Sequence, residues 1–357
     1  MKLVCALLIA IGLAIPVGVQ ALEPERVGQE DSLSRSIFAV GRLWLLSDAG
    51  HLSTITEGEH GAVRIEVAEP VLDVCAQNGH PIVITGERDK PKNWTLRHWS
   101  GGTWTTQTTV PTEGDALVAL DCVSNRVTVL TTRRLIDVRA EVASSIHLSK
   151  PLPGALVSST FGTADMFFVG LNAGEWGGGL RRIDRRTGKT TSIERNATGD
   201  LCGGPLNAGC DPVNGLVTEP WRPQCIVVAI GLVHMSPHGR LVEVCGDQVT
   251  RLYFNPYRQA MIRGEAPAKK PPPKDVEPFS TVAFFGLVPQ GAYVLAVGID
   301  GMYRIGQDGI AQVTPLPKFN KIGDFYVNFD LPHVVLVMSS VNQRRSLSGA
   351  VPMVISR

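Results

Sequence analysis

The sequence predicts an all-β fold, namely a single β-propeller of seven four-stranded blades. The chain has 357 residues with 37 glycines and 24 prolines, a composition that favours turns and short strands over long helices. After the N-terminal segment there is no long helical period, whereas short apolar runs separated by Gly, Asp and Asn turns recur along the chain. A repeat of about 40 residues containing four strands is typical of a propeller blade.

Seven repeats can be followed along the sequence. They begin near Ser36, Val71, Leu117, Leu156, Asn214, Ser280 and Asp324. The apolar runs that come first within each repeat, such as LVALDCV and CIVVAIG, are dense in Val, Ile and Leu, as expected of strands buried on both faces. The last repeat weakens after Ser340 and has Pro352 in its final strand, and residues 22–35 could supply the strand that closes the ring. Six or eight blades, or a pair of β-sandwiches, are therefore the alternatives.

Residues 1–21 have the pattern of a secretory signal peptide. One basic residue precedes an apolar run, Pro16 interrupts it, and the small residues Val19 and Ala21 fit a cleavage site. The alternative is an uncleaved membrane anchor. We therefore expect residues 22–357 to form a propeller domain that is periplasmic or secreted, with no membrane span after cleavage.

If the protein is exported, the cysteines outside the signal peptide are expected to form disulfides. There are six of them: Cys75, Cys122, Cys202, Cys210, Cys225 and Cys245. An even number in an oxidising compartment predicts disulfides, although six cysteines allow 15 pairings. A bridge across the eight-residue Cys202–Cys210 spacing would stiffen its loop by roughly 2–3 kcal/mol.

Several repeats resemble those of bacterial extracytoplasmic β-propellers, including sensor-type regulator propellers and quinoprotein-like propellers. The resemblance rests on GRLWLLSDAGHLSTI, GEWGGGLRRIDRRTGKTTSI and VGIDGMYRIGQDGI, which combine a buried strand with a glycine-rich turn and a tight turn. It covers most of the chain as a fold and implies no catalytic residue. The tryptophan that quinoprotein repeats carry after TGK is absent from TGKTTSIE.

In propellers generally, with strands lettered a to d from the axis outward, the b–c and d–a loops share one rim, and ligands bind there. The long segments of this chain fall at those positions, which predicts a ligand-binding rim near blades 4 and 5. They are residues 86–93, 171–179, 194–213, 232–238 and 255–279, of which 194–213 and 255–279 are the longest insertions. The binding-rim candidates are Asn172, Glu175, Trp176, Asp211, Glu219, His234, His238 and Arg258.

The chemistry of these candidates supports two readings. Trp176 beside a carboxylate suits stacking on a sugar or another flat ligand, but it could also pack on the next blade. Glu175, Asp211 and Glu219 could form an acidic cluster for acid–base work, or they could be capping and solvated groups. Trp94, Trp99 and Trp104, spaced by five, suggest a carbohydrate-stacking strip or packing of outer strands.

His234 and His238 lie in CIVVAIGLVHMSPHGRLVEVCG, and their position depends on the hairpin register. If Cys225 bonds Cys245, Gly231 faces Gly239 and the loop tip is long. If the turn is instead SPHG, the two cysteines are offset and need other partners. Two histidines four apart on a loop are a weak metal site, since a metal needs further ligands. No metal is therefore predicted.

Composition and motifs limit the function. With 34 basic and 33 acidic residues the net charge is +1, which argues against a nucleic-acid partner. The sequence has no GxSxG, HExxH or Walker motif, so catalytic residues and cofactors stay unknown. We expect a monomeric, non-catalytic module that binds a protein or carbohydrate on the long-loop rim. The alternative is an enzyme acting on a glycan or small polar substrate through rim carboxylates.

Overall fold

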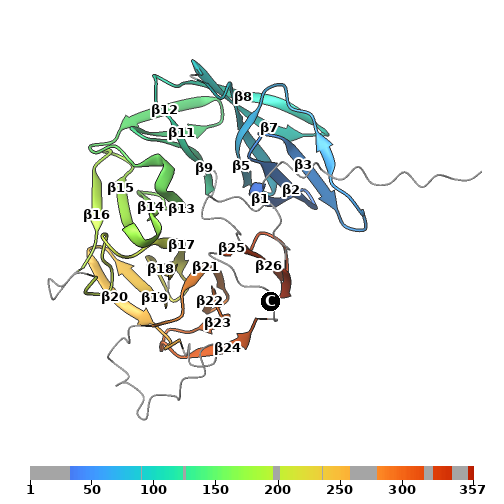
Figure 1. Ribbon diagram of the computed structural model, residues 1–357. Coiled ribbons are helices and arrows are strands. Elements are labelled where there is room, and N and C mark those ends of the chain that lie inside the picture. The colour runs from blue at the N-terminus through green and yellow to red at the C-terminus, as the bar shows by residue number, and fades with distance from the viewer. Residues whose placement is uncertain are drawn as a thin grey trace, which may run out of the picture.

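The chain folds into a ring of antiparallel sheets (Figure 1). A computed structural model describes residues 33–89, 91–123, 126–195, 202–234, 236–257, 280–316, 325–339 and 353–357. The predicted signal peptide, Arg258 and most of the 255–279 insertion lie outside these residues. Within them the order is six four-stranded sheets and a seventh of three strands, so the chain is a seven-bladed β-propeller. The β-sandwich alternative is wrong, because sequential strands pair within one sheet before the chain moves to the next.

The strands follow the predicted repeats closely. Blades 1 and 2 contain β1 (Leu33–Ala39), β2 (Arg42–Ser47), β3 (Leu52–Thr56), β4 (Val63–Ile65), β5 (Val71–Gln77), β6 (His80–Thr85), β7 (Asn93–Ser100) and β8 (Thr103–Pro111). Blades 3 and 4 contain β9 (Leu117–Val123), β10 (Arg126–Thr131), β11 (Arg134–Arg139), β12 (Val142–His147), β13 (Val157–Gly162), β14 (Met166–Asn172), β15 (Gly178–Asp184) and β16 (Thr190–Ile193), with short 3₁₀ turns η1 (Gly154–Leu156) and η2 (Gly174–Trp176).

Blades 5 to 7 complete the ring. They contain β17 (Val213–Glu219), β18 (Arg222–His234), β19 (Ser236–Cys245), β20 (Gln248–Tyr253), β21 (Phe284–Gln290), β22 (Tyr293–Gly298), β23 (Gly301–Ile305), β24 (Ala311–Pro315), β25 (Phe325–Asn328), β26 (Val334–Ser339) and β27 (Met353–Ser356). No helix in the described part of the chain is long and apolar enough to cross a membrane.

Non-covalent contacts close the ring between the last blade and the first. In Figure 1 the red strands β25 and β26 lie beside the blue strand β1. The Asn328 Nδ2 donates a hydrogen bond of 3.0 Å to the Ser36 carbonyl, which joins the innermost strands β25 and β1. Of the segment predicted to close the ring, residues 33–35 belong to β1, the innermost strand of blade 1, and residues 22–32 lie outside the described residues.

The core lies between the blades, where apolar side chains of neighbouring sheets interdigitate. The three tryptophans predicted as a stacking strip belong to it. Trp94 is buried, and Trp99 and Trp104 pack edge-on against the buried Trp44, at centroid distances of 5.3 and 5.8 Å. The packing alternative is therefore confirmed, since these rings offer no exposed strip to a sugar.

Three disulfides pair all six predicted cysteines. Cys75 bonds Cys122 between blades 2 and 3, Cys202 bonds Cys210 within one insertion, and Cys225 bonds Cys245 across β18 and β19. Such bonds persist in oxidising compartments and indicate an extracytoplasmic location.

Candidate functional site

A cavity of about 800 Å³ opens between blades 4 and 5, on the rim of the b–c and d–a loops. Its walls come from segments that are far apart in the sequence, including η2, the 194–213 insertion, the tip of the β18–β19 hairpin and the outer strand β20. The lining residues are Glu175, Arg195, Cys202, Gly204, Pro205, Cys210, Leu232, His234, Ser236, His238, Arg240, Val249, Thr250 and Arg251. Three of the predicted rim candidates, Glu175, His234 and His238, therefore meet at one place.

The hairpin register explains why both histidines face the cavity. Leu232 lies opposite His238, and His234 lies opposite Ser236. Residues directly opposite each other, and residues two apart on one strand, share a face of an antiparallel sheet. The face that carries both histidines therefore also carries Arg240, two residues beyond His238. This is the long-tip register, in which Gly231 faces Gly239 and Cys225 bonds Cys245.

The opposite face of the hairpin packs on blade 6. Gly231 and Gly239 lie against the main chain of Phe284 and Ala283, so closely that a Cβ on either glycine would overlap it. Thr281 strengthens the contact, because its amide donates a hydrogen bond of 3.0 Å to the Pro237 carbonyl. The hairpin is thus held on one side and presents its polar side to the cavity.

Arg240 is the buried centre of the site. Its guanidinium contacts a carboxylate oxygen of Asp211 at 2.6 Å, and the two side chains are 1% and 0% exposed. The Arg240 Nε also donates to the Pro205 carbonyl at 2.8 Å, which ties the Cys202–Cys210 loop to the hairpin. Asp211 further accepts a hydrogen bond of 2.6 Å from the Asn207 amide. Asp211 therefore neutralises Arg240 and holds the insertion.

The tautomer of His238 follows from its neighbour. The Arg240 Nη1 lies 3.0 Å from the His238 Nε2, and a guanidinium can only donate, so Nε2 accepts this hydrogen bond. The proton of a neutral ring is then on Nδ1. The Asp211 Oδ1 is 3.5 Å from the same Nε2, a distance too long to compete with the Arg240 contact. His238 is therefore positioned by Arg240.

Glu175 and Trp176 belong to the turn η2; Glu175 lines the cavity, whereas Trp176, the next residue, is not part of its lining. The His234 Nδ1 lies 2.7 Å from the Glu175 Oε2, so these two side chains bind each other across the boundary between blades 4 and 5. Trp176 is 80% exposed, the largest exposed fraction of any large apolar side chain in the described residues. Gly177, at φ +89°, lies against Gly209 and lets the turn approach the insertion. An exposed indole next in sequence to a cavity-lining residue is a candidate contact for a partner.

Glu219 does not belong to this site. It ends β17 at the a–b turn, whereas Asp211 precedes the same strand, so the length of β17, about 20 Å at 3.3 Å per residue, separates them. Glu219 is fully buried and accepts from the Arg222 Nε at 2.9 Å. Cys225 and Cys245 lie beside it, but their sulfurs form a disulfide and offer no metal ligand. The expected acidic cluster of Glu175, Asp211 and Glu219 is therefore absent, because Glu219 lies at the opposite rim.

Asn172 has a structural contact in addition to its place on the rim. Its Nδ2 donates to the Asn214 Oδ1 at 2.7 Å, and its Oδ1 accepts from the Gly174 amide at 2.8 Å. Asn214 donates in turn to the carbonyls of Gly231 and Phe284. Asn172 thus shapes the η2 turn and links blade 4 to blades 5 and 6 without lining the cavity.

Sequence reasoning missed the three arginines of the cavity, Arg195, Arg240 and Arg251. Arg240 could have been found, because strand alternation places it on the face of His238. Arg195 could not, because its position depends on the bridge that it forms with Leu206 in the insertion. Arg251 lies on β20, an outer strand that the loop-based prediction did not consider.

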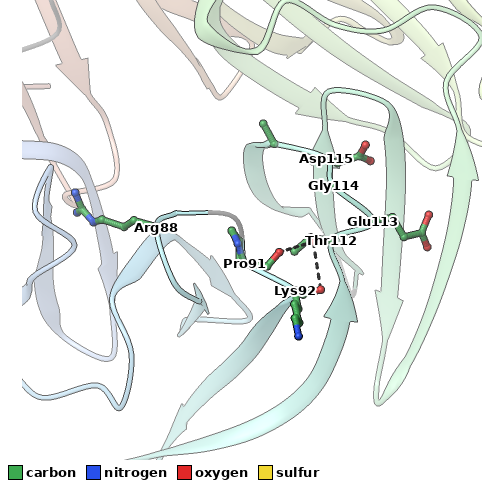
Figure 2. A pocket seen from close by; sticks show the side chains of 8 residues that line it. Arg88, Pro91, Lys92, Thr112, Glu113, Gly114 and Asp115 are labelled. Carbon is green, nitrogen blue, oxygen red and sulfur yellow. Dashed lines mark hydrogen bonds between the residues drawn. The ribbon is translucent and has the colours of Figure 1, made fainter.

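A second cavity of about 700 Å³ lies on the same rim between blades 2 and 3 (Figure 2). Its charged side chains do not converge: Arg88 and Glu113 extend in opposite directions in Figure 2, toward partners outside the cavity. Arg88 donates to the Asp48 carbonyl, and Glu113 pairs with Arg134 at 2.8 Å. Burial tends to raise the pKa of Asp115, but hydrogen bonds from Arg134, Arg133 and Thr131 hold it below its ordinary value. These groups are engaged in anchoring the crossover to blade 3.

Comparisons with known proteins agree with the fold and go no further. No protein-family model and no curated protein matches the chain. Its structure is similar to that of YCF48 from Cyanidioschyzon merolae, at 11% identity and a TM-score of 0.53, covering 86% of this chain and 92% of that one. YCF48 bound to D1 peptide is similar at 10% identity and 0.52, covering 86% and 88%.

The extracellular domain of the one component system BT4673 from B. thetaiotaomicron is 15% identical at a TM-score of 0.46. The match covers 87% of this chain but only 37% of that one, so this chain spans less than two fifths of its length. These identities are too low to place the chain in a family. The fold defines its class, a disulfide-bonded seven-bladed β-propeller.

Proposed function

We propose that this protein is an exported, non-catalytic binding module that holds a segment of a partner protein in the cavity between blades 4 and 5. The observation that carries the proposal is the convergence of Glu175, His234 and His238, from separate segments, on one cavity of about 800 Å³. Cavities of this size with a few placed polar groups are typical binding sites.

The distribution of carboxylates argues against the enzyme alternative. Acid–base pairs of glycan-active enzymes lie within about 10 Å of each other. Glu219 is on the opposite rim, and Asp211 is fully buried under Arg240, with its Oδ2 bound by the Arg240 guanidinium and the Asn207 amide. Glu175 is left as the single carboxylate lining the cavity in the described residues, and it is bound by His234. One carboxylate supports binding better than bond cleavage.

The exposed Trp176 supports a protein partner. Tryptophan is enriched at the centres of protein interfaces, where a large rigid ring supplies contact area at low entropic cost. Apolar cavity walls at Leu232, Pro205 and Val249 add to this surface. One fold relative, YCF48, has been solved with a peptide bound, which is consistent with this use of the fold.

Export rests on the three disulfides and on the signal-like residues 1–21. We propose that the mature protein acts as a monomer in the periplasm or outside the cell. The buried apolar clusters pack neighbouring blades against one another from blade 1 round to blade 7.

The test is selection of ligands by the purified protein from a random dodecapeptide library, with a glycan array in parallel. Peptides should be enriched, and their binding should fall at least tenfold in Trp176→Ala. The matched control is Ile310→Ala, which removes another exposed apolar side chain from a c–d turn on the opposite rim. Binding of glycans alone, or peptide binding that neither variant changes, would contradict the proposal.

A further inference from the structure

We infer that the Cys225–Cys245 disulfide is a site of thiol–disulfide exchange with a dithiol reductant, and that the buried carboxylate of Glu219 stabilises its reduced form. The site lies on the rim opposite the cavity, so the inference goes beyond the proposed function and does not depend on it. Three observations carry it: the carboxylates that face the sulfurs, the unequal exposure of the two cysteines, and the strand pairing around them.

Glu219 has a buried oxygen that no group in the described residues satisfies. Its side chain is 0% exposed, and its Oε1 accepts from the Arg222 Nε at 2.9 Å, whereas its Oε2 is buried without a hydrogen-bond partner. A carboxylate oxygen of Glu219 and the sulfurs of Cys225 and Cys245 all lie within 4.8 Å of one another. An unpaired buried acceptor costs folding free energy, and a proton on a neighbouring sulfur would satisfy it.

A second carboxylate lies beside Cys245. The Glu243 Oε1 is 3.5 Å from the Cys245 Sγ, and its Oε2 pairs with Arg222, which therefore holds both carboxylates. A disulfide sulfur has no proton to donate, whereas a thiol does, so reduction supplies hydrogen bonds that the disulfide cannot make. The Glu243 Oε1 also accepts from the Thr250 hydroxyl at 3.3 Å, so Glu219 gains more from reduction. These hydrogen bonds shift the exchange equilibrium toward the dithiol.

The two cysteines differ in their access to solvent. Cys225 is 1% exposed, whereas Cys245 is half-buried and is followed by the exposed residues 246–248. An incoming thiolate therefore attacks the Cys245 sulfur, because access selects the sulfur that reacts. A bond forms between the reductant and Cys245, the Cys225–Cys245 bond breaks, and Cys225 leaves as a thiolate that takes up a proton beside Glu219.

The second thiol of the reductant then displaces Cys245, which is protonated from solvent. Two electrons pass to the protein, the reductant becomes a disulfide, and the two protons that its thiols release are replaced on the two cysteines. No further oxidant or reductant is needed for this exchange.

The β18–β19 hairpin has its own pairing around this bond. Cys225 and Cys245 are opposite each other at the end of a ladder in which residues 226–234 pair with residues 236–244. Their Cα atoms are 4.5 Å apart, the spacing of a pair that shares no main-chain hydrogen bond, so the thiols can separate without breaking one. The Cys75–Cys122 bond instead joins strands of two blades. Reduction of Cys225–Cys245 should therefore leave the protein folded.

The experiment equilibrates the protein near neutral pH with reduced and oxidised dithiothreitol in varied ratios. Alkylation and peptide mass spectrometry then quantify each cysteine pair. The equilibrium constant for reduction of Cys225–Cys245 should exceed that of Cys75–Cys122 at least tenfold, which is about 30 mV for a two-electron couple. Circular dichroism should show folded protein at ratios that reduce Cys225–Cys245 alone of these two bonds.

The variant Glu219→Gln tests the role of the carboxylate. It should lower the equilibrium constant for reduction of Cys225–Cys245 at least fivefold and leave that of Cys75–Cys122 unchanged in the same sample. The matched control is Glu113→Gln, which removes another carboxylate paired with an arginine and should change neither constant.

Single-cysteine variants test which sulfur is attacked. The Cys245 thiol of Cys225→Ser should form a mixed disulfide with oxidised glutathione at least tenfold faster than the Cys225 thiol of Cys245→Ser. Thermal unfolding of both variants shows that they are folded, and equal rates in two folded variants would contradict the assigned order of attack.

The inference is overturned if Cys225–Cys245 is reduced no more readily than Cys75–Cys122, or if the protein unfolds when it is reduced. It is also overturned if Glu219→Gln leaves the equilibrium unchanged. None of these results bears on the cavity between blades 4 and 5, so the proposed function stands or fails by its own test.

Discussion

The side chains of Arg240 and Asp211 form a fully buried ion pair, 2.6 Å apart, that joins the β18–β19 hairpin to the 194–213 insertion. Removing one partner leaves the other charge buried without compensation, so Arg240→Met or Asp211→Asn should each lower the free energy of unfolding by about 3–5 kcal/mol. The double variant should cost less than the sum of the two. Urea unfolding of the four proteins measures this coupling, and additive losses would show that the pair does not act as a unit.

Each disulfide should stabilise the protein by an amount that increases with the number of residues between its two cysteines. The Cys75–Cys122 bond spans 47 residues and Cys202–Cys210 spans 8. Loop-closure entropy then predicts losses of about 4 kcal/mol for Cys75→Ser/Cys122→Ser and about 2.5 kcal/mol for Cys202→Ser/Cys210→Ser. Non-reducing urea unfolding compares them. A larger loss for the short loop would point to strain or contacts that loop entropy does not describe.

The glycine pair of the hairpin should tolerate no side chain. Gly231→Ala places a methyl group against the Phe284 main chain, which cannot turn away, and should cost about 2 kcal/mol or more. The control is Gly306→Ala, where the nearest atom is an Asp308 side-chain oxygen at 3.2 Å that can move. Thermal unfolding of both variants measures the difference, and equal melting temperatures would contradict the close packing.

Asp121 should make the protein less stable as pH rises through its titration range. Burial is the main cause that raises its pKa to about 6, with Asp73 acting in the same direction and Arg35 and Arg185 opposing. One of its carboxylate oxygens is buried without a hydrogen-bond partner. Between the unfolded pKa of about 4 and about 6 the folded state binds more protons, so the free energy of unfolding falls as pH increases there.

Asp121→Asn removes this titration. The variant should be more stable than the parent by about 2 to 3 kcal/mol at pH 8, and the difference should shrink as pH falls through 6 and vanish below about 4. Thermal unfolding across this pH range tests it. A pH-independent difference would show that Asp121 does not titrate as its burial predicts.

Local pattern was enough to predict the blades. Starts near Val71 and Leu117 are the first residues of β5 and β9, because alternation and Gly turns are properties of a few consecutive residues. The hairpin register was predicted as one of two alternatives, and the Cys225–Cys245 bond selects between them. Glu219 was predicted on the ligand-binding rim. It is instead the last residue of β17, and this end of the strand lies at the a–b turn on the opposite rim.

The sequence by itself determined the all-β class, the seven repeats, the long loops of one rim and the presence of six cysteines that can form disulfides. Each of these depends only on composition and on the spacing of residues that are close in the sequence. Tertiary structure alone decided which loops meet. Arg195 and Arg251 are 56 positions apart and share a cavity only because blades 4 and 5 are adjacent in the ring and the insertion folds back onto Arg240. Such contacts depend on how neighbouring sheets pack, and the repeat pattern of the sequence does not predict this packing.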